Sequence, residues 1–259
     1  MKHLGLFVIL ILSISCMHNK AKDDLLNSQH TEDHSKLRPV NLESYSQDFF
    51  LALRTDSPYG AFVDTIERID LNYLGKTLNT QNKKLAFWIN TYNALVQVKI
   101  KKSPDSFSNI NSFFKDKDLL IGGVSVSLDD LENGILRSQP ISDQMEFCEK
   151  FRLDSLDCRI HFTLNCGATS CPAIAYYESE HIEDQLNLAE RFFVQNHSTY
   201  DQAKNELTIS ELFKWFESDF GGRTGVLLIM EKHEILVNNN PPKIKYNQYD
   251  WGLNAGKYD

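Results

Sequence analysis

The segment from about residue 80 to residue 102 constrains the fold most, because its apolar side chains recur at spacings of three and four. Such spacing places them on one face of an α-helix. The residues that share this face are Leu85, Trp88, Ile89, Tyr92, Leu95 and Val96. Asn79 or Thr80 can cap the start of the helix, and the lysines near its end suit the helix dipole. We therefore expect a long helix here, with its apolar face in the core.

The rest of the chain mixes helical and extended patterns. Further helices are expected from residue 42 to the break at Ser57-Pro58, over residues 60–69 and 179–196, and after Ser127 and Ser210. The expected strands are residues 119–121, 124–126, 158–165, 207–209 and 243–249. Gly122-Gly123 joins the first two strands, as in a two-residue hairpin. The predicted fold class is α+β, with a small, mostly antiparallel sheet packed against several helices.

The first residues combine a basic start, an apolar run from Leu4 to Leu12 and small residues before Cys16. This pattern fits a secretory signal, since the run is shorter than the roughly 20 apolar residues that span a bilayer. The small residues resemble the lipobox of bacterial lipoproteins, which implies cleavage after Ser15 and a lipid anchor on Cys16. By the sorting rule for Gram-negative lipoproteins, Met17 favours the outer membrane. The alternatives are ordinary signal cleavage with a free periplasmic protein, or a buried N-terminal strand or helix.

The chain is therefore expected to comprise a signal peptide (1–15), a lipidated flexible tether (16–40) and a single globular domain (41–259). Loss of residues 1–15 removes one lysine and no acid, so the formal charge changes from −8 to −9. An acidic chain argues against nucleic-acid binding. The expected contact with a membrane runs through the lipid on Cys16, and a protein or small-molecule partner remains open.

The segment from Arg159 to Pro172 concentrates the groups that could carry chemistry. Its expected strand ends in a glycine-containing loop that holds Cys166 and Cys171. A thiol acts as a nucleophile only as the thiolate, so it needs a nearby base, and His161 is the nearest in sequence. In a straight strand, His161 would lie about 16 Å from Cys166. Either the loop folds back or Cys171 is the closer partner.

Other interpretations of these cysteines stay open. Cys166 and Cys171 can form a structural disulfide, can be buried small residues, or can join His161 or His181 in a zinc site. With Cys16 lipidated, the remaining four cysteines permit three pairings. We expect neither a cofactor nor stoichiometric zinc.

Two further polar sets accompany this segment. Asn90 and Asn93, with Gln97, lie beside the apolar stripe of the long helix, where an amide could orient an imidazole. They could instead bond to neighbouring backbone groups at the edge of the core. Glu132 and Arg137 could form a buried ion pair or could be solvated.

Five motifs together resemble the domain of unknown function 547 family. They are Phe87–Ala94, Leu128–Arg137, His161–Pro172, Ile209–Phe216 and Tyr249–Asn254. The resemblance covers roughly residues 80 to 254 and implies no established reaction. Where the family commonly has His after the acidic residue of the second motif, this chain has Asn133.

Three functions are consistent with these residues. The first is a thiol-dependent hydrolase or acyltransferase, with Cys166 or Cys171 as nucleophile, His161 as base and Asn90 or Asn93 as the orienting group. The second is a non-catalytic envelope module that binds a partner, with a structural disulfide and with aromatic residues that line a pocket or patch. The third is a metal-dependent function that uses the cysteines and a histidine.

Overall fold

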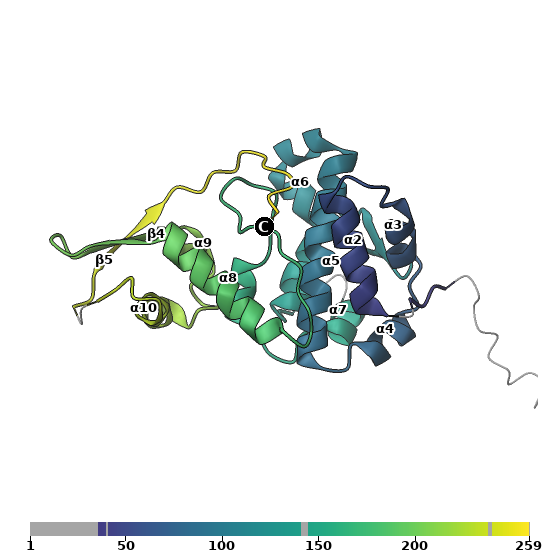
Figure 1. Cartoon of the computed structure of the whole chain (residues 1–259), viewed down its shortest axis with the longest axis horizontal. Helices are drawn as coiled ribbons and strands as arrows, with labels where there is room; N and C mark the ends of the chain where they lie inside the picture. Colours follow the sequence, from purple (N-terminus) through teal and green to yellow (C-terminus); the bar gives the residue numbers. More distant parts are fainter. Residues whose placement is uncertain (1–35, 40, 141–144, 238–239, 259) are drawn as a thin grey trace, which may run out of the picture. The chain divides into compact units, whose positions relative to one another are not determined.

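The computed structural model describes residues 36–39, 41–140, 145–237 and 240–258 (Figure 1). The expected signal peptide, Cys16 and nearly all of the expected tether lie outside the described residues. The fold is α+β, as predicted, although the described residues form two small sheets rather than one. The α-helices are α2 (Leu42–Arg54), α3 (Gly60–Glu67), α4 (Leu71–Thr77), α5 (Gln81–Lys102), α6 (Ile110–Lys115), α7 (Met145–Phe151), α8 (Ile182–His197), α9 (Leu212–Trp215) and α10 (Gly222–Lys232). None of the described helices is long and apolar enough to cross a membrane.

Helix α5 is the expected long helix. It begins after Thr80, whose hydroxyl accepts a hydrogen bond from the Lys83 backbone N–H at 3.3 Å. Every residue from Leu85 to Ile100 is buried, so neighbouring segments cover this helix on all sides rather than on one apolar face. Its buried polar side chains therefore need partners inside the protein. These side chains are Asn90, Thr91, Asn93, Gln97 and Lys99.

The predicted hairpin is confirmed. Strands β1 (Leu119–Ile121) and β2 (Val124–Val126) pair antiparallel around Gly122 and Gly123. Both glycines have positive φ, 58° and 83°, as a type I′ turn requires. A Cβ on Gly122 would lie 2.4 Å from a Leu71 methyl carbon, so only glycine fits the turn here.

The second sheet has the order β3-β4-β5. Strands β3 (Thr199–Asp201) and β4 (Glu206–Ser210) pair antiparallel, whereas β5 (Lys243–Asn247) pairs parallel to β4. Leu207 and Ile209 are fully buried and belong to a second hydrophobic core, to which α8, α9 and α10 also contribute. The larger first core surrounds α5.

The predicted strand over residues 158–165 is wrong. Residues Cys158–Phe162 form a short 3-10 helix, η3, because the Asp157 carboxylate caps it by accepting from the Arg159 backbone N–H at 3.0 Å. The alternation of apolar residues has another cause. Ile160 enters the first core and Phe162 enters the second, so η3 lies where the two cores meet. His161 between them is also buried rather than facing away from the core.

Candidate functional site

The 3-10 helix η3 holds His161 in a buried position against the segment that follows α9. Only 3% of His161 is exposed, and its ring stacks on Phe216 with 3.9 Å between ring centroids. His161 Nε2 lies 2.9 Å from Asp219 Oδ2. No described residue forms a hydrogen bond with His161 Nδ1. The carboxylate of Asp219 therefore fixes the orientation of this imidazole, in the place where an asparagine side chain was predicted.

Arg137 holds Asp219 from the other side. It lies just after the π-helical turn η2 (Asp130–Leu136) and donates from Nε to Asp219 Oδ2 at 2.6 Å and from Nη2 to Oδ1 at 3.1 Å. Burial favours a higher pKa for Asp219, but hydrogen bonds from His161 and Arg137 outweigh it and hold this pKa well below its ordinary value. Asp219 is therefore ionised at neutral pH.

His161 remains neutral beside this carboxylate. Burial lowers the pKa of His161 below its ordinary value, and the hydrogen bond to Asp219 offsets the effect only in part. A neutral imidazole next to an ionised carboxylate must donate its Nε2 hydrogen. Its Nδ1 then carries the lone pair of a base.

Glu132 is the second titratable group of the site. Tyr92 on α5 donates from its hydroxyl to Glu132 Oε2 at 2.9 Å. Burial raises the pKa of Glu132, and the Tyr92 hydrogen bond and the charge of Arg137 offset this only in part. Arg137 forms its ion pair with Asp219, so the pairing of Arg137 with Glu132 that the sequence left open as one possibility is not the one present. Opposed pKa shifts on neighbouring groups are typical of acid–base sites.

A cavity of about 140 Å³ brings these groups together, and we call it the His161 cavity. It is lined by His161, Glu132, Tyr92 and Cys166, together with an aromatic cluster. The cluster consists of Trp215, Tyr249 and Trp251, whose ring centroids lie 4.8 to 5.7 Å apart. The two tryptophans are 43% and 41% exposed, which is unusual for side chains of this size. The cavity thus has titratable groups and a broad apolar wall.

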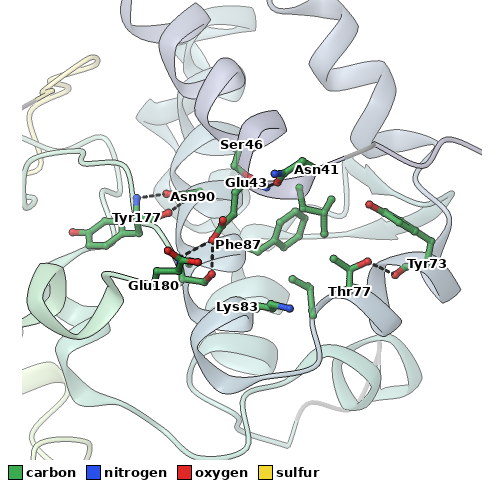
Figure 2. Close-up of a pocket in the computed structure, with 14 residues that line it drawn as sticks. Asn41, Glu43, Ser46, Tyr73, Thr77, Lys83, Phe87, Asn90, Tyr177 and Glu180 are labelled. Carbon is green, nitrogen blue, oxygen red and sulfur yellow. Dashed lines mark hydrogen bonds between the residues drawn. The ribbon is translucent and has the colours of Figure 1, made fainter.

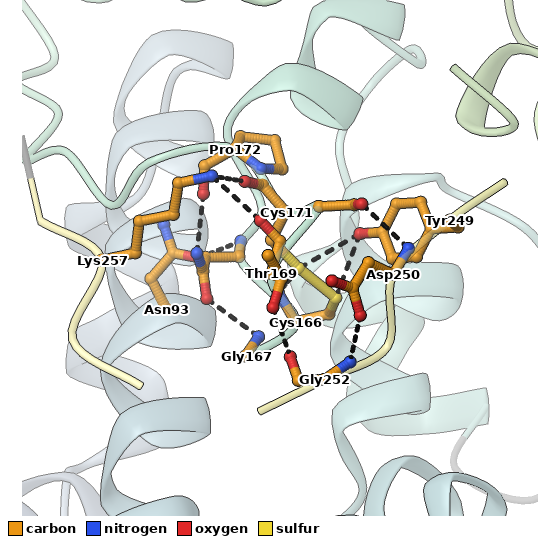
Figure 3. Close-up of a disulfide and its surroundings, with 12 residues drawn as sticks. Asn93, Cys166, Gly167, Thr169, Cys171, Pro172, Tyr249, Asp250, Gly252 and Lys257 are labelled. Atoms are coloured by element: carbon orange, nitrogen blue, oxygen red, sulfur yellow. Dashed lines mark hydrogen bonds between the residues drawn. A yellow bond between two sulfur atoms is a disulfide. The ribbon is translucent and has the colours of Figure 1, made fainter. Parts of the chain in front are cut away.

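Cys166 and Cys171 are joined by a disulfide, with 6.1 Å between their Cα atoms. The C-terminal segment that contains Gly252 and Lys257, which we call the C-terminal clamp, holds the loop that this bond closes (Figure 3). Thr169 N–H donates to the Gly252 carbonyl, and Lys257 Nζ donates to the Cys171 carbonyl at 2.7 Å. Of the interpretations left open by the sequence, the disulfide is the one present in this structure, so neither sulfur is a free thiol here.

Asn90 and Asn93 both bond to backbone groups. Asn90 donates to the Tyr177 carbonyl at 2.8 Å and accepts from its N–H at 2.9 Å. Figure 2 shows this contact at one side of a separate cavity of about 310 Å³. Asn93 donates to the Thr163 carbonyl at 3.0 Å and accepts from Asn165 N–H at 2.8 Å. Both amides thus hold the chain on either side of the disulfide loop. Of the two roles that the sequence left open for them, they bond to backbone groups and do not orient the imidazole.

The other two described cysteines are free. Burial raises the pKa of Cys148 to about 12 and that of Cys158 to about 11, so both are protonated thiols at neutral pH. Among the described residues, no group of three or more His, Cys, Asp or Glu side chains is placed to hold a metal ion. His181 lies at the start of α8.

Sequence reasoning missed Asp219 and the role of Tyr249. Asp219 lies between Phe216 and Phe220, and an acid within an aromatic run is a signal for a buried, paired carboxylate. Tyr249 belongs to a motif that the resemblance covered, but no pattern in the sequence places its hydroxyl beside the two sulfurs.

Comparison with known proteins gives a similarity to a protein family but no activity. Neither the curated proteins nor the solved structures contain a match. The model of one family matches a segment that contains only part of the site. The match includes Tyr92, Glu132, Arg137, His161 and both disulfide cysteines, and it ends before Asp219, Tyr249 and Trp251. That segment, residues 76–194, is similar to the family described as "Protein of unknown function, DUF547", and it contains three of the five motifs on which the expected resemblance rested.

Proposed function

We propose that this protein is a lipid-anchored envelope hydrolase that cleaves acyl bonds, esters or amides, by acid–base catalysis in the His161 cavity. The observation that carries the proposal is the opposed pKa shifts of two groups that line one cavity. Burial lowers the pKa of His161 and raises that of Glu132. One group is thereby suited to accept a proton and the other to donate one at a common pH.

His161 acts as the general base in this proposal. Its Nδ1 takes a proton from a water molecule, which then attacks the carbonyl carbon of the bound substrate. The imidazolium that results is stabilised by Asp219, which already accepts its Nε2 hydrogen at 2.9 Å. Arg137 keeps Asp219 ionised, so the carboxylate does not take that proton.

Glu132 supplies the proton that the leaving group needs. Its raised pKa keeps a larger fraction of the carboxyl protonated than in water. Tyr92 donates to Glu132 Oε2, which leaves Oε1 as the oxygen that carries the proton. The exposed faces of Trp215 and Trp251 offer an apolar surface for the part of the substrate outside the cavity.

A thiol-dependent mechanism is a second candidate, because Cys166 lines the same cavity as His161. Cys166 would be the nucleophile, His161 the base and Asp219 the orienting group. This mechanism requires the disulfide to Cys171 to be reduced first. The thiol-dependent mechanism predicts activity that appears only with reductant and is lost in Cys166→Ser. The acid–base mechanism requires neither a reductant nor the Cys166 thiol.

The hydrolase is tested with p-nitrophenyl acetate, whose acyl group is small enough for a cavity of about 140 Å³. His161→Gln should lower kcat/KM by roughly 10²- to 10⁴-fold, because the general base is lost. His197→Gln is the matched control, since His197 is also stacked on a phenylalanine and bonds only to a backbone carbonyl. Equal rates for wild type and His161→Gln would refute the acid–base hydrolase.

The same experiment separates the non-catalytic alternative. A binding module would show no turnover in either protein, and its disulfide loop and C-terminal clamp would serve only to hold the aromatic cluster in place. Turnover of any acyl probe that depends on His161 excludes it.

The envelope location rests on the apolar run Leu4–Leu12 and on Cys16. Anchoring of the mature protein through acyl chains at Cys16 would hold the hydrolase at a membrane surface, with the outer membrane favoured by Met17. Mass spectrometry of the mature N-terminal peptide should find a lipidated Cys16 and no residue before it. Cys16→Ser should abolish the modification, and an unmodified, uncleaved wild-type N-terminus would contradict the proposal.

A further inference from the structure

The disulfide is asymmetric in its exposure. Cys166 is half-buried and lines the His161 cavity, whereas Cys171 has no exposed surface and borders a different cavity. A thiolate that enters the His161 cavity can therefore reach the Cys166 sulfur but not the Cys171 sulfur. Thiol–disulfide exchange requires in-line attack on one sulfur and departure of the other, so access from the His161 cavity selects Cys166 as the sulfur attacked.

The hydrogen bonds around the disulfide favour the same direction. Cys171 Sγ accepts from the Cys166 backbone N–H at 3.0 Å and from the Tyr249 hydroxyl at 3.2 Å. Cys166 Sγ has only the longer contact to Tyr249, at 3.4 Å. Figure 3 shows the Tyr249 hydroxyl beside the disulfide. Two donors stabilise negative charge on the Cys171 sulfur, which makes it the better leaving group.

Tyr249 keeps its proton over the whole working range of pH, because burial raises its pKa well above the ordinary value. Its hydroxyl therefore remains a donor when the disulfide opens. The loop itself is held by the C-terminal segment through Thr169 and Lys257, so Cys171 stays in place after it is released.

From the agreement of access and hydrogen bonding, we infer that the Cys166–Cys171 disulfide is an exchange centre that oxidises substrate thiols, with Cys166 as the attacked sulfur. This activity goes beyond the proposed hydrolase and does not depend on it. In the first step, a substrate thiolate forms a bond to Cys166 Sγ. The Cys166–Cys171 bond breaks, and Cys171 leaves as a thiolate that then takes a proton from water.

In the second step, another thiolate of the same substrate attacks the substrate sulfur of the mixed disulfide. A disulfide forms within the substrate, and Cys166 leaves as a thiolate. The substrate dithiol has then been oxidised by two electrons, and the protein disulfide has been reduced to a dithiol. A cysteine pair on a peptide and a small dithiol share this chemistry, and the apolar wall of Trp215 and Trp251 favours the peptide.

The test uses the oxidised wild-type protein and two monothiol probes, glutathione and a short apolar peptide with one cysteine. After a brief incubation, free thiols are alkylated and the loop peptides are mapped by mass spectrometry. The expected product carries the probe on Cys166 and the alkyl group on Cys171. Faster reaction of the peptide than of glutathione supports the peptide as the substrate class, and the reverse order points to a small thiol.

Tyr249→Phe tests the leaving-group argument. Loss of a hydrogen bond to a developing thiolate should slow formation of the mixed disulfide about tenfold. Tyr45→Phe is the matched control, because the Tyr45 hydroxyl is also partly buried but donates to the Phe62 carbonyl. Adducts on Cys171, equal amounts on both sulfurs, or a disulfide that opens only in denaturant would overturn the inference.

Discussion

Among the residues that the structure describes, two sets join a buried histidine and a buried carboxylate to a cation. In one, Asp219 joins His161 at 2.9 Å and Arg137 at 2.6 Å. In the other, Glu190 on α8 joins His233, just after α10, at 2.8 Å and Lys232 at 2.9 Å. We call them the Asp219 set and the Glu190 set.

Their surroundings differ although their contacts are alike. His161 itself lines a cavity that also contains Glu132. The Glu190 set ties α8 to the end of α10, and although Glu190 and Lys232 border a pocket, His233 does not line it. Arg137 is 12% exposed, while Lys232 is 52% exposed and reaches water. The comparison teaches that a fixed imidazole is not by itself a site. A base also needs a space for a substrate and a second group that shares the proton transfer.

The largest expected difference between the two sets is in activity. Asp219→Asn should lower kcat with p-nitrophenyl acetate by roughly 10²- to 10⁴-fold, because an amide can hold His161 in the wrong tautomer. Glu190→Gln makes the matching change in the other set and should leave kcat within about twofold. Steady-state kinetics on both variants, with folding checked by circular dichroism, make the comparison. Equal losses in the two variants would mean that both sets act only through stability.

The next largest difference is in stability. Asp219→Ala leaves the buried Arg137 without its ion-pair partner, which should cost about 3–5 kcal/mol of unfolding free energy. Glu190→Ala should cost less, about 1–3 kcal/mol, because Lys232 can turn to water. Urea unfolding at pH 7 measures both values. A larger loss of unfolding free energy in Glu190→Ala than in Asp219→Ala would contradict the argument that the buried Arg137 depends more on its carboxylate partner than the exposed Lys232 does.

The pH profile of activity should report the shifted pKa values of His161 and Glu132. Activity requires neutral His161, so it falls on the acid side with a midpoint below the ordinary histidine pKa of about 6.5. It also requires protonated Glu132, so the alkaline limb reports the raised pKa of that group. Tyr92→Phe removes a donor that favours the ionised carboxylate and should move the alkaline limb to higher pH. If the alkaline limb of Tyr92→Phe stays at the wild-type pH, Glu132 is not the general acid.

The smallest expected effect concerns Glu132 and stability. Its folded-state pKa is raised, so its contribution is present below the unfolded pKa and is lost as pH rises through the folded pKa. Glu132→Gln lacks this loss, so the stability difference between variant and wild type should increase from acidic to neutral pH. Thermal unfolding of both proteins at a series of pH values measures this difference. A stability difference that does not change with pH would contradict the prediction.

The sequence predicted those elements whose signals are local. Helix α5 and the Gly122-Gly123 hairpin follow from periodicity and from a turn that needs positive φ at both residues. Short elements such as α4 and α6, with seven and six residues, carry too little periodicity to be predicted. The 3-10 helix η3 imitated a strand because Ile160 and Phe162 enter two different cores.

The site was predictable only in part, for a similar reason. His161, Cys166 and Cys171 were identified because they lie within one short segment. Asp219 lies 58 residues away from His161, and no local pattern indicates that it would replace Asn90 or Asn93 as the orienting group. Long-range pairing of this kind is set by how α9 packs, which depends on tertiary contacts rather than on local sequence.

The central claim is that His161 is a neutral base fixed by Asp219, and nitrogen NMR of labelled histidine tests it most directly. We expect His161 to be protonated on Nε2 alone at pH 7, to carry an unprotonated Nδ1, and to titrate below the ordinary histidine value. Asp219→Asn should change this tautomer, while Glu190→Gln should not. An imidazolium at pH 7, or a proton on Nδ1 rather than Nε2, would contradict the account.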